Sequence, residues 1–223
     1  MLVRHAQPDW EPLGRACDDP LLTAYGHQQA EALAQWLAPQ SFDGFFVSPT
    51  RRTLQTSQPV SQFWNRQATV LPWLEEIRTP HLDGTPEDEV KAFIASARNR
   101  PLQDWWTGLP GGESFHDFHQ RVTSGLDAFL SEVVQGVRHN ELWQFPSQPR
   151  RHLLVAHLGT ISVLLSHLLQ IPPVPWEWER FPLSWAGTCV VRTNPVADGH
   201  IWALQHFNQV HHLEHLAWTS APS

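Results

Sequence analysis

The sequence is poor in lysine, in cysteine and in long apolar runs, and each scarcity excludes a class of protein. Its 15 basic residues, of which only Lys91 is a lysine, are outnumbered by 22 acidic ones, and the net charge is -7. Such a chain lacks the basic surface that binds nucleic acid or anionic lipid. No apolar stretch reaches the roughly 18 residues that span a bilayer, and no charged and then apolar leader precedes the first strand. We therefore expect a cytoplasmic protein without nucleic-acid or membrane partners.

Neither the cysteines nor the histidines follow a disulfide or metal-binding pattern. Cys17 and Cys189 are far apart and belong to no CxxC pair, which is typical of reduced thiols. The stretch HFNQVHHLEH (206–215) is rich in histidine, yet it lacks a regular ligand spacing with a carboxylate or cysteine partner. We expect no metal and no other cofactor.

The periodicity of apolar residues predicts strands that alternate with helices. Strands are predicted at 2–5, 45–47, 69–71, 150–157, 188–192 and 201–207, the last two as a hairpin. Helices are predicted at 22–38, 50–64, 87–98, 115–133 and 159–169, and Pro59 is expected to kink or end the first half of the second one. This alternation predicts an α/β fold, a three-layer α/β/α sandwich with a mainly parallel central sheet.

The length of 223 residues suits one domain with a substantial core. No internal repeat or clear linker divides the chain. We expect a single domain over residues 1–223, with insertions near 78–113, 135–151 and 172–186.

Two histidines each follow an apolar strand. His5 comes directly after Arg4 in LVRH, and His157 ends LLVAH. The carboxyl ends of parallel strands meet at one edge of an open sheet, where ligands bind. If both strands are parallel and central, the two imidazoles and the Arg4 guanidinium share one pocket.

The helix that follows a third strand adds positive charge. In VSPTRR, Arg51 and Arg52 stand at the start of this helix. Arginine side chains near a helix amino terminus suit a phosphate dianion, and an imidazole can attack phosphorus. Such a reaction also needs a carboxyl group to protonate the departing oxygen. The candidates are Glu75, Glu76 and Asp83 in EEIRTPHLD.

These segments, in this order, resemble the histidine phosphatase superfamily, which includes cofactor-dependent phosphoglycerate mutases and many small-molecule phosphatases. RHA resembles its opening Arg-His-Gly, SPTRRTLQT its helix after the second strand, LEEI its acidic segment and HLGTI its second histidine motif. PLLTAYGHQQAEAL and PGGESFHDFHQRV add support, and the resemblance covers most of residues 2–165.

The resemblance implies a role for particular residues. His5 would be the nucleophile and Glu76 the proton donor, with Asp83 as a competitor, while Arg4, Arg52 and His157 would bind phosphate. Candidate substrate contacts are Gln7, Thr23, Asp83, Glu113, Ser114 and Leu158, although Glu113 and Ser114 are most simply interpreted as turn and cap residues.

Three positions depart from the family pattern. Ala6 replaces a glycine, which is tolerated if the backbone there is not left-handed. Leu158 replaces a glycine and is expected to narrow or redirect the site. Glu11 stands where the mutase pattern has asparagine, and its carboxylate would repel a phosphate unless it points away.

The function expected from these features is metal-independent hydrolysis of a small-molecule phosphomonoester through phosphohistidine, by a monomer or homodimer. The alternatives are a phosphoglycerate mutase-type phosphotransferase, or a phosphate-binding protein on the same fold that has lost catalysis. Tryptophan and proline in the 80s loop, in the 100–113 segment and in the 176–181 stretch favour a leaving group that is partly apolar.

Overall fold

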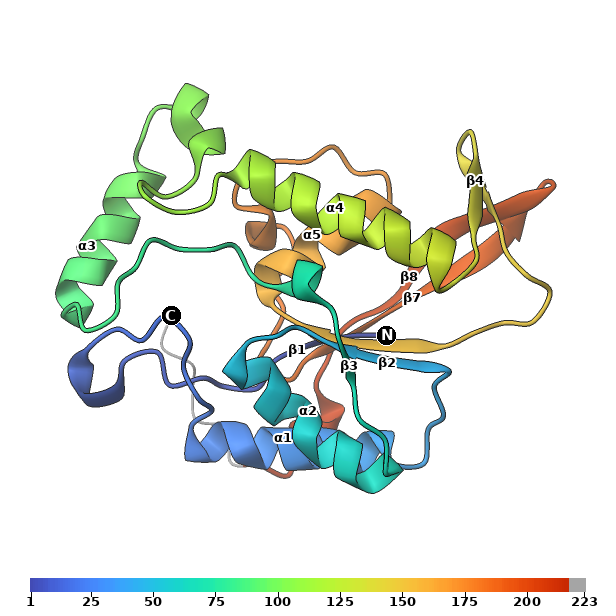
Figure 1. The fold of residues 1–223 in the computed structure, drawn as a ribbon, viewed down its shortest axis with the longest axis horizontal. Coiled ribbons are helices and arrows are strands. Elements are labelled where there is room, and N and C mark those ends of the chain that lie inside the picture. Colours follow the sequence, from blue (N-terminus) through green and yellow to red (C-terminus); the bar gives the residue numbers. More distant parts are fainter. Residues whose placement is uncertain (217–223) are drawn as a thin grey trace.

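One eight-stranded mixed sheet forms the centre of the computed structural model, which describes residues 1–216 (Figure 1). Its strands are β1 (Leu2–Arg4), β2 (Gly44–Val47), β3 (Thr69–Val70), β4 (Val137–His139), β5 (Leu142–Gln144), β6 (His152–Ala156), β7 (Thr188–Val196) and β8 (Gly199–Gln209). Its α-helices are α1 (Ala24–Leu37), α2 (Arg51–Trp64), α3 (Glu87–Arg98), α4 (Phe115–Glu132) and α5 (Leu158–Leu168).

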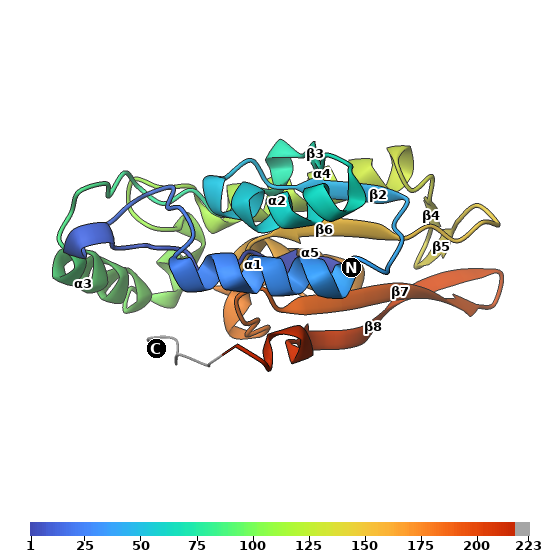
Figure 2. The ribbon, with the colours of Figure 1, turned by 90° about the horizontal axis from the view of Figure 1, so that it is seen from below.

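The sheet is only half parallel, so the prediction of a mainly parallel sheet is wrong. Its strand order is β3-β2-β6-β1-β7-β8-β5-β4, in which the pairs from β3 to β1 are parallel and the rest antiparallel. The antiparallel half arises because β7 and β8 are joined by a tight turn, with no helix to return the chain. The hairpin of β4 and β5 extends that half, and both hairpins project beyond the helices (Figure 2).

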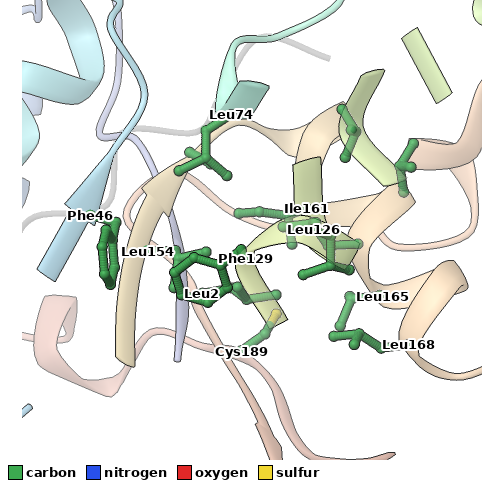
Figure 3. Close-up of a cluster of buried hydrophobic side chains, with 14 of the residues drawn as sticks. Leu2, Phe46, Leu74, Leu126, Phe129, Leu154, Ile161, Leu165, Leu168 and Cys189 are labelled. Atoms are coloured by element: carbon green, nitrogen blue, oxygen red, sulfur yellow. The ribbon is translucent and has the colours of Figure 1, made fainter. Parts of the chain in front are cut away.

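Helices cover both faces of the parallel half, as the α/β prediction requires. α4 and α5 lie on one face, and α1 and α2 lie side by side on the other (Figure 1). Successive residues of β2 point to opposite faces, so Phe46 joins the core under α4 and α5 whereas Phe45 joins the core over α1 and α2. Figure 3 shows Phe46 and Leu154 beside Phe129 of α4 in the larger core.

The apolar helix α5 packs inside this core and has 11 residues. Within residues 1–216, no helix is both long enough and apolar enough to cross a membrane.

The histidine-rich stretch packs on α1. His212 is 6% exposed, stacks on Trp36 with ring centroids 5.2 Å apart, and donates from Nε2 to the Ala186 carbonyl at 3.1 Å. Burial lowers its pKa to about 4. No group of three His, Cys, Asp or Glu side chains among residues 1–216 is arranged to hold a metal ion.

Buried His212 predicts a loss of stability in acid. With a pKa of about 4 in the folded chain and about 6.5 in the unfolded chain, the unfolded state binds more protons between these values. The free energy of unfolding therefore decreases as the pH is lowered from about 6.5 to about 4, by about 3 kcal/mol for this group. His212→Phe, which keeps an aromatic ring against Trp36, is expected to show a shallower fall in urea unfolding from pH 7 to 4.5.

The exposed residue His206 offers a matched control, since His206→Phe is expected to leave the pH dependence unchanged. An unaltered pH dependence in His212→Phe would contradict this account.

Candidate active site

Parallel pairing of β1 with β6 brings the two strand-end histidines together. Arg4 lies opposite Ala156 in the register, and the His5 amide donates to the Ala156 carbonyl at 2.9 Å. The His5 and His157 side chains therefore leave neighbouring strands at the same end, and their ring centroids are 5.2 Å apart.

The His5 ring is held with one nitrogen free. Its Nδ1 lies 2.8 Å from the carbonyl oxygen of Ala6, which can only accept, so Nδ1 carries the proton and Nε2 carries the lone pair. Burial, aided by the charges of Arg52 and Arg4, lowers the pKa of His5 well below its usual value. The ring is thus neutral at pH 7, as a nucleophile must be.

His157 is fully buried beside it. A hydrogen bond of 2.7 Å joins its Nε2 to the Ser48 hydroxyl, and Thr50 lies at 3.4 Å from the same atom. Its Nδ1 has no partner among the described residues. Burial and the charge of Arg52 lower its pKa.

The guanidinium groups of buried Arg52 and half-buried Arg4 lie near these rings. Arg4 donates to the Leu183 carbonyl, and Arg52 Nη1 lies 3.3 Å from Asp19. Burial lowers the pKa of Arg4 to about 10 and also lowers that of Arg52. The Nε atoms of both arginines are buried without a partner in residues 1–216. Because an unpaired buried donor is costly, this arrangement favours an anion with several acceptor oxygens.

The Glu76 carboxyl lies at the amino terminus of α5. It accepts hydrogen bonds from the amides of Gly159 at 2.8 Å and Thr160 at 3.1 Å. A Cβ atom at position 159 would lie 2.5 Å from Glu76 Oε1, so glycine is needed for this approach. The Glu76 charge acts on both Arg4 and Arg52.

A cavity of about 360 Å³ opens above Arg52 and Glu76. Its other lining residues are Asp18, Asp19, Pro49, Thr50, Glu75, Ile77, Arg78, Thr79 and His81. Only Pro49 and Ile77 are apolar, and neither the 100–113 segment nor the 176–181 stretch contributes to the lining. The lining is therefore mostly polar, and Arg4, His5 and His157 are not part of it.

Four of the other candidate residues are engaged elsewhere. Gln7 accepts a hydrogen bond of 2.7 Å from the hydroxyl of Thr23, which also caps α1. Ser114 caps α4 by accepting from the Asp117 amide at 3.0 Å. Leu158 packs against the main core and does not line the cavity.

Asp83 and Glu113 likewise lie outside the cavity lining. Asp83 is exposed and accepts from the Asp18 amide at 3.1 Å, whereas Glu113 forms an ion pair with Arg121. Of the two acids that competed for the proton-donor role, only Glu76 lines the cavity.

The structure accommodates two of the departures from the family pattern, Ala6 and Glu11. Ala6 is absent from the left-handed residues of the described chain, so its side chain introduces no strain. Glu11 is exposed and is not part of the cavity lining. Partial desolvation, followed by the charge of Glu87 of α3, raises its pKa.

Sequence reasoning assigned no role to Ser48, Thr50 and Asp19, which contact His157 and Arg52. Ser48 and Thr50 stand inside the SPTRR segment, and that motif could have revealed them. Asp19 carried no such signal, because its contact with Arg52 depends on how the loop before α1 folds back.

Comparisons with known proteins agree with this geometry. The model of the "Histidine phosphatase superfamily (branch 1)" matches residues 1–209. A probable phosphoglycerate mutase of Yersinia enterocolitica is 29% identical over 77% of this chain and 75% of its own. Phosphoserine phosphatase 1 of Hydrogenobacter thermophilus is 31% identical over 60% of this chain and 63% of its own.

Solved structures share the fold. The alpha-ribazole phosphatase of Shigella flexneri superposes with a TM-score of 0.71 at 23% identity, over 93% of this chain and 95% of that one. A mycobacterial glucosyl-3-phosphoglycerate phosphatase superposes with a TM-score of 0.70 at 24% identity, over 94% and 97%. The chain therefore belongs to branch 1 of the histidine phosphatase superfamily and is an enzyme of the histidine phosphatase type.

Proposed function

We propose that this enzyme hydrolyses a small, polar phosphomonoester without a metal ion, through a phosphohistidine formed on His5. The observation that carries the proposal is the neutral His5 ring, whose Nδ1 is bound to the Ala6 carbonyl and whose Nε2 is free. The unpartnered Nε groups of Arg4 and Arg52 supply donors for the phosphoryl oxygens.

In the first step the Nε2 lone pair of His5 attacks phosphorus, and the bond between phosphorus and the ester oxygen breaks. Glu76 gives its proton to that oxygen, so that an alcohol leaves. The Ala6 carbonyl stabilises the positive charge that develops on the His5 ring. Arg4 and Arg52 compensate the charge of the transferring phosphoryl group, which is the main requirement of phosphoryl transfer. The neutral His157 ring can donate a hydrogen bond to this group from Nδ1, which has no partner among the described residues.

In the second step a water molecule attacks the phosphohistidine. The Glu76 carboxylate takes a proton from this water, the bond between phosphorus and nitrogen breaks, and its electron pair returns to Nε2. Inorganic phosphate leaves, and both His5 and Glu76 regain their starting protonation states. No step requires a redox change or a bound metal.

The polar cavity supports a polar leaving group. Asp18, Glu75, Arg78 and His81 line it beyond Arg52, and they offer hydrogen bonds to hydroxyl, amino or carboxyl groups. Relatives named as phosphatases of phosphoserine and of glucosyl-3-phosphoglycerate, both polar esters, support the same substrate class.

Turnover in the presence of EDTA tests this proposal. Purified enzyme should release inorganic phosphate from p-nitrophenyl phosphate and from some members of a panel of phosphorylated hydroxy acids, amino acids and sugars. EDTA should not change these rates. Well-folded enzyme that binds phosphate but turns over no ester would contradict hydrolysis and favour a binding protein. Migration of phosphate within an ester, without release, would favour the mutase alternative.

A further inference from the structure

A single arginine of α4 holds the segment that carries Glu76. Arg121 donates from Nη1 to the carbonyls of Trp73 at 3.2 Å and Glu75 at 3.0 Å, and from Nη2 to the Glu76 carbonyl at 3.2 Å. Its side chain is 17% exposed. One guanidinium group therefore binds three backbone carbonyls at and before Glu76, and the Glu75 carbonyl also accepts from the Thr160 hydroxyl at 3.1 Å.

Glu113 of the PGGES turn orients this guanidinium. Its two carboxylate oxygens accept from Arg121 Nε at 2.8 Å and Nη2 at 2.7 Å, a paired geometry that fixes the plane of the group. The side chain of Glu113 is 9% exposed, so solvent screens this pair only weakly.

Glu113 also binds the same segment directly, just beyond Glu76. Its amide donates to the Arg78 carbonyl at 2.7 Å, and its carboxylate accepts from the Arg78 amide at 3.1 Å. A Cβ atom on Gly112 would lie 2.7 Å from the Arg78 carbonyl, so this close approach needs glycine in the turn.

The other end of the segment rests on α4. A Cβ atom on Gly125 would lie 2.3 Å from the Trp73 ring, which shows how closely that ring packs on the helix. The segment from Trp73 to Arg78 is thus fixed on both sides of Glu76.

We propose that Glu113 and Arg121 form a clamp that positions the Glu76 carboxyl over the departing oxygen, an inference that rests on the proposed function of Glu76. Both are positioning residues, since their side chains contact each other and the backbone around Glu76. In this proposal the PGGES turn does more than cap α4 through Ser114, because its Glu113 side chain also positions Glu76.

The leaving group separates positioning from general stability. An alkyl phosphomonoester has a poor leaving group that needs the Glu76 proton, whereas p-nitrophenolate leaves without one. A displaced carboxyl should slow the alkyl ester selectively. A clamp that only stabilised the fold would change both rates in the same proportion.

The experiment compares kcat/KM for the best alkyl ester of the panel with kcat/KM for p-nitrophenyl phosphate. In Arg121→Gln we expect the ratio of the two to fall about 10- to 100-fold, with most of the loss in kcat. Glu113→Gln, which keeps the shape of the side chain and removes its charge, is expected to lower the ratio in the same direction and by less. Glu113→Gln also tests the clamp if the Arg121→Gln variant does not fold.

Arg66→Gln is the matched control, because exposed Arg66 likewise donates to two backbone carbonyls, those of Phe42 and Asp43, away from the site. Its ratio should equal that of the wild type. Adding Arg121→Gln to Glu76→Gln should lower the ratio no further, because both changes remove the same proton transfer.

An equal loss for both esters in Arg121→Gln and Glu113→Gln would overturn the clamp, as would an unchanged ratio. If Glu76→Gln itself leaves the ratio unchanged, the role proposed for Glu76 fails instead. The two failures are therefore distinguishable.

Discussion

Replacing His5 by alanine is expected to reduce hydrolysis of every phosphomonoester by at least about 10⁴-fold, because no other described group offers a free lone pair at this position. The ring Nδ1 is bound to the Ala6 carbonyl, so only Nε2 can attack. Steady-state rates with p-nitrophenyl phosphate and with the best alkyl ester measure the loss.

Binding of inorganic phosphate separates a chemical defect from a folding defect. Arg4, Arg52 and His157 remain in His5→Ala, so the variant should still bind phosphate in calorimetry. Residual turnover within about tenfold of the wild type, in a variant that still binds phosphate, would contradict a nucleophilic role for His5.

Replacing Glu76 by glutamine is the second large effect that we expect. The variant should lose about 10² to 10⁴ in kcat/KM for alkyl esters, the usual contribution of a positioned proton donor. With p-nitrophenyl phosphate, the rate of phosphohistidine formation should fall much less, because p-nitrophenolate leaves without a proton. A burst of p-nitrophenol followed by slow turnover should then appear, since Glu76 is also the base for the attacking water.

A glutamine amide at this position would place an NH₂ group near the Gly159 and Thr160 amides, which now donate to Glu76. Thermal unfolding of Glu76→Gln therefore needs to accompany the kinetics. Equal losses for alkyl and p-nitrophenyl esters, without a burst, would contradict the assignment of Glu76 as acid and base.

The residues that follow buried strands were the predictable part of the site. His5 and His157 each follow an apolar run, and such runs become neighbouring parallel strands, so their side chains meet at one edge. Arg52 was predictable for a related reason, since it lies in the first turn of the helix after β2. Local sequence patterns are therefore sufficient to predict those site residues whose positions are set by the strands of the sheet.

The contacts made by loops could not be predicted in this way. Glu113 was a candidate substrate contact, yet it pairs with Arg121, eight residues further along the chain. Asp19 reaches Arg52 only because the loop before α1 folds over the start of α2. These contacts depend on the folded positions of separate elements, and no spacing in the sequence encodes them.

The secondary structure, too, was predictable in some elements and not in others. The helices and the parallel strands follow apolar periodicity. In contrast, β4 and β5 have three residues each and β4 is exposed throughout, so they are too short to show an apolar pattern. Helix α2 continues through Pro59, contrary to the expectation that Pro59 could end its first half. Burial of Pro59 and Val60 offsets the lost backbone hydrogen bond there.

The formation of phosphohistidine on His5 is the central claim, and rapid quenching with alkali tests it most directly. Wild-type enzyme mixed with excess p-nitrophenyl phosphate and quenched within the first turnovers should carry one phosphoryl group on His5. This group should be stable in alkali, labile in acid, and located by mass spectrometry of the peptide that contains residues 2–10. Active enzyme that carries no phosphoryl group at early times, or carries it on a residue other than His5, would contradict the mechanism.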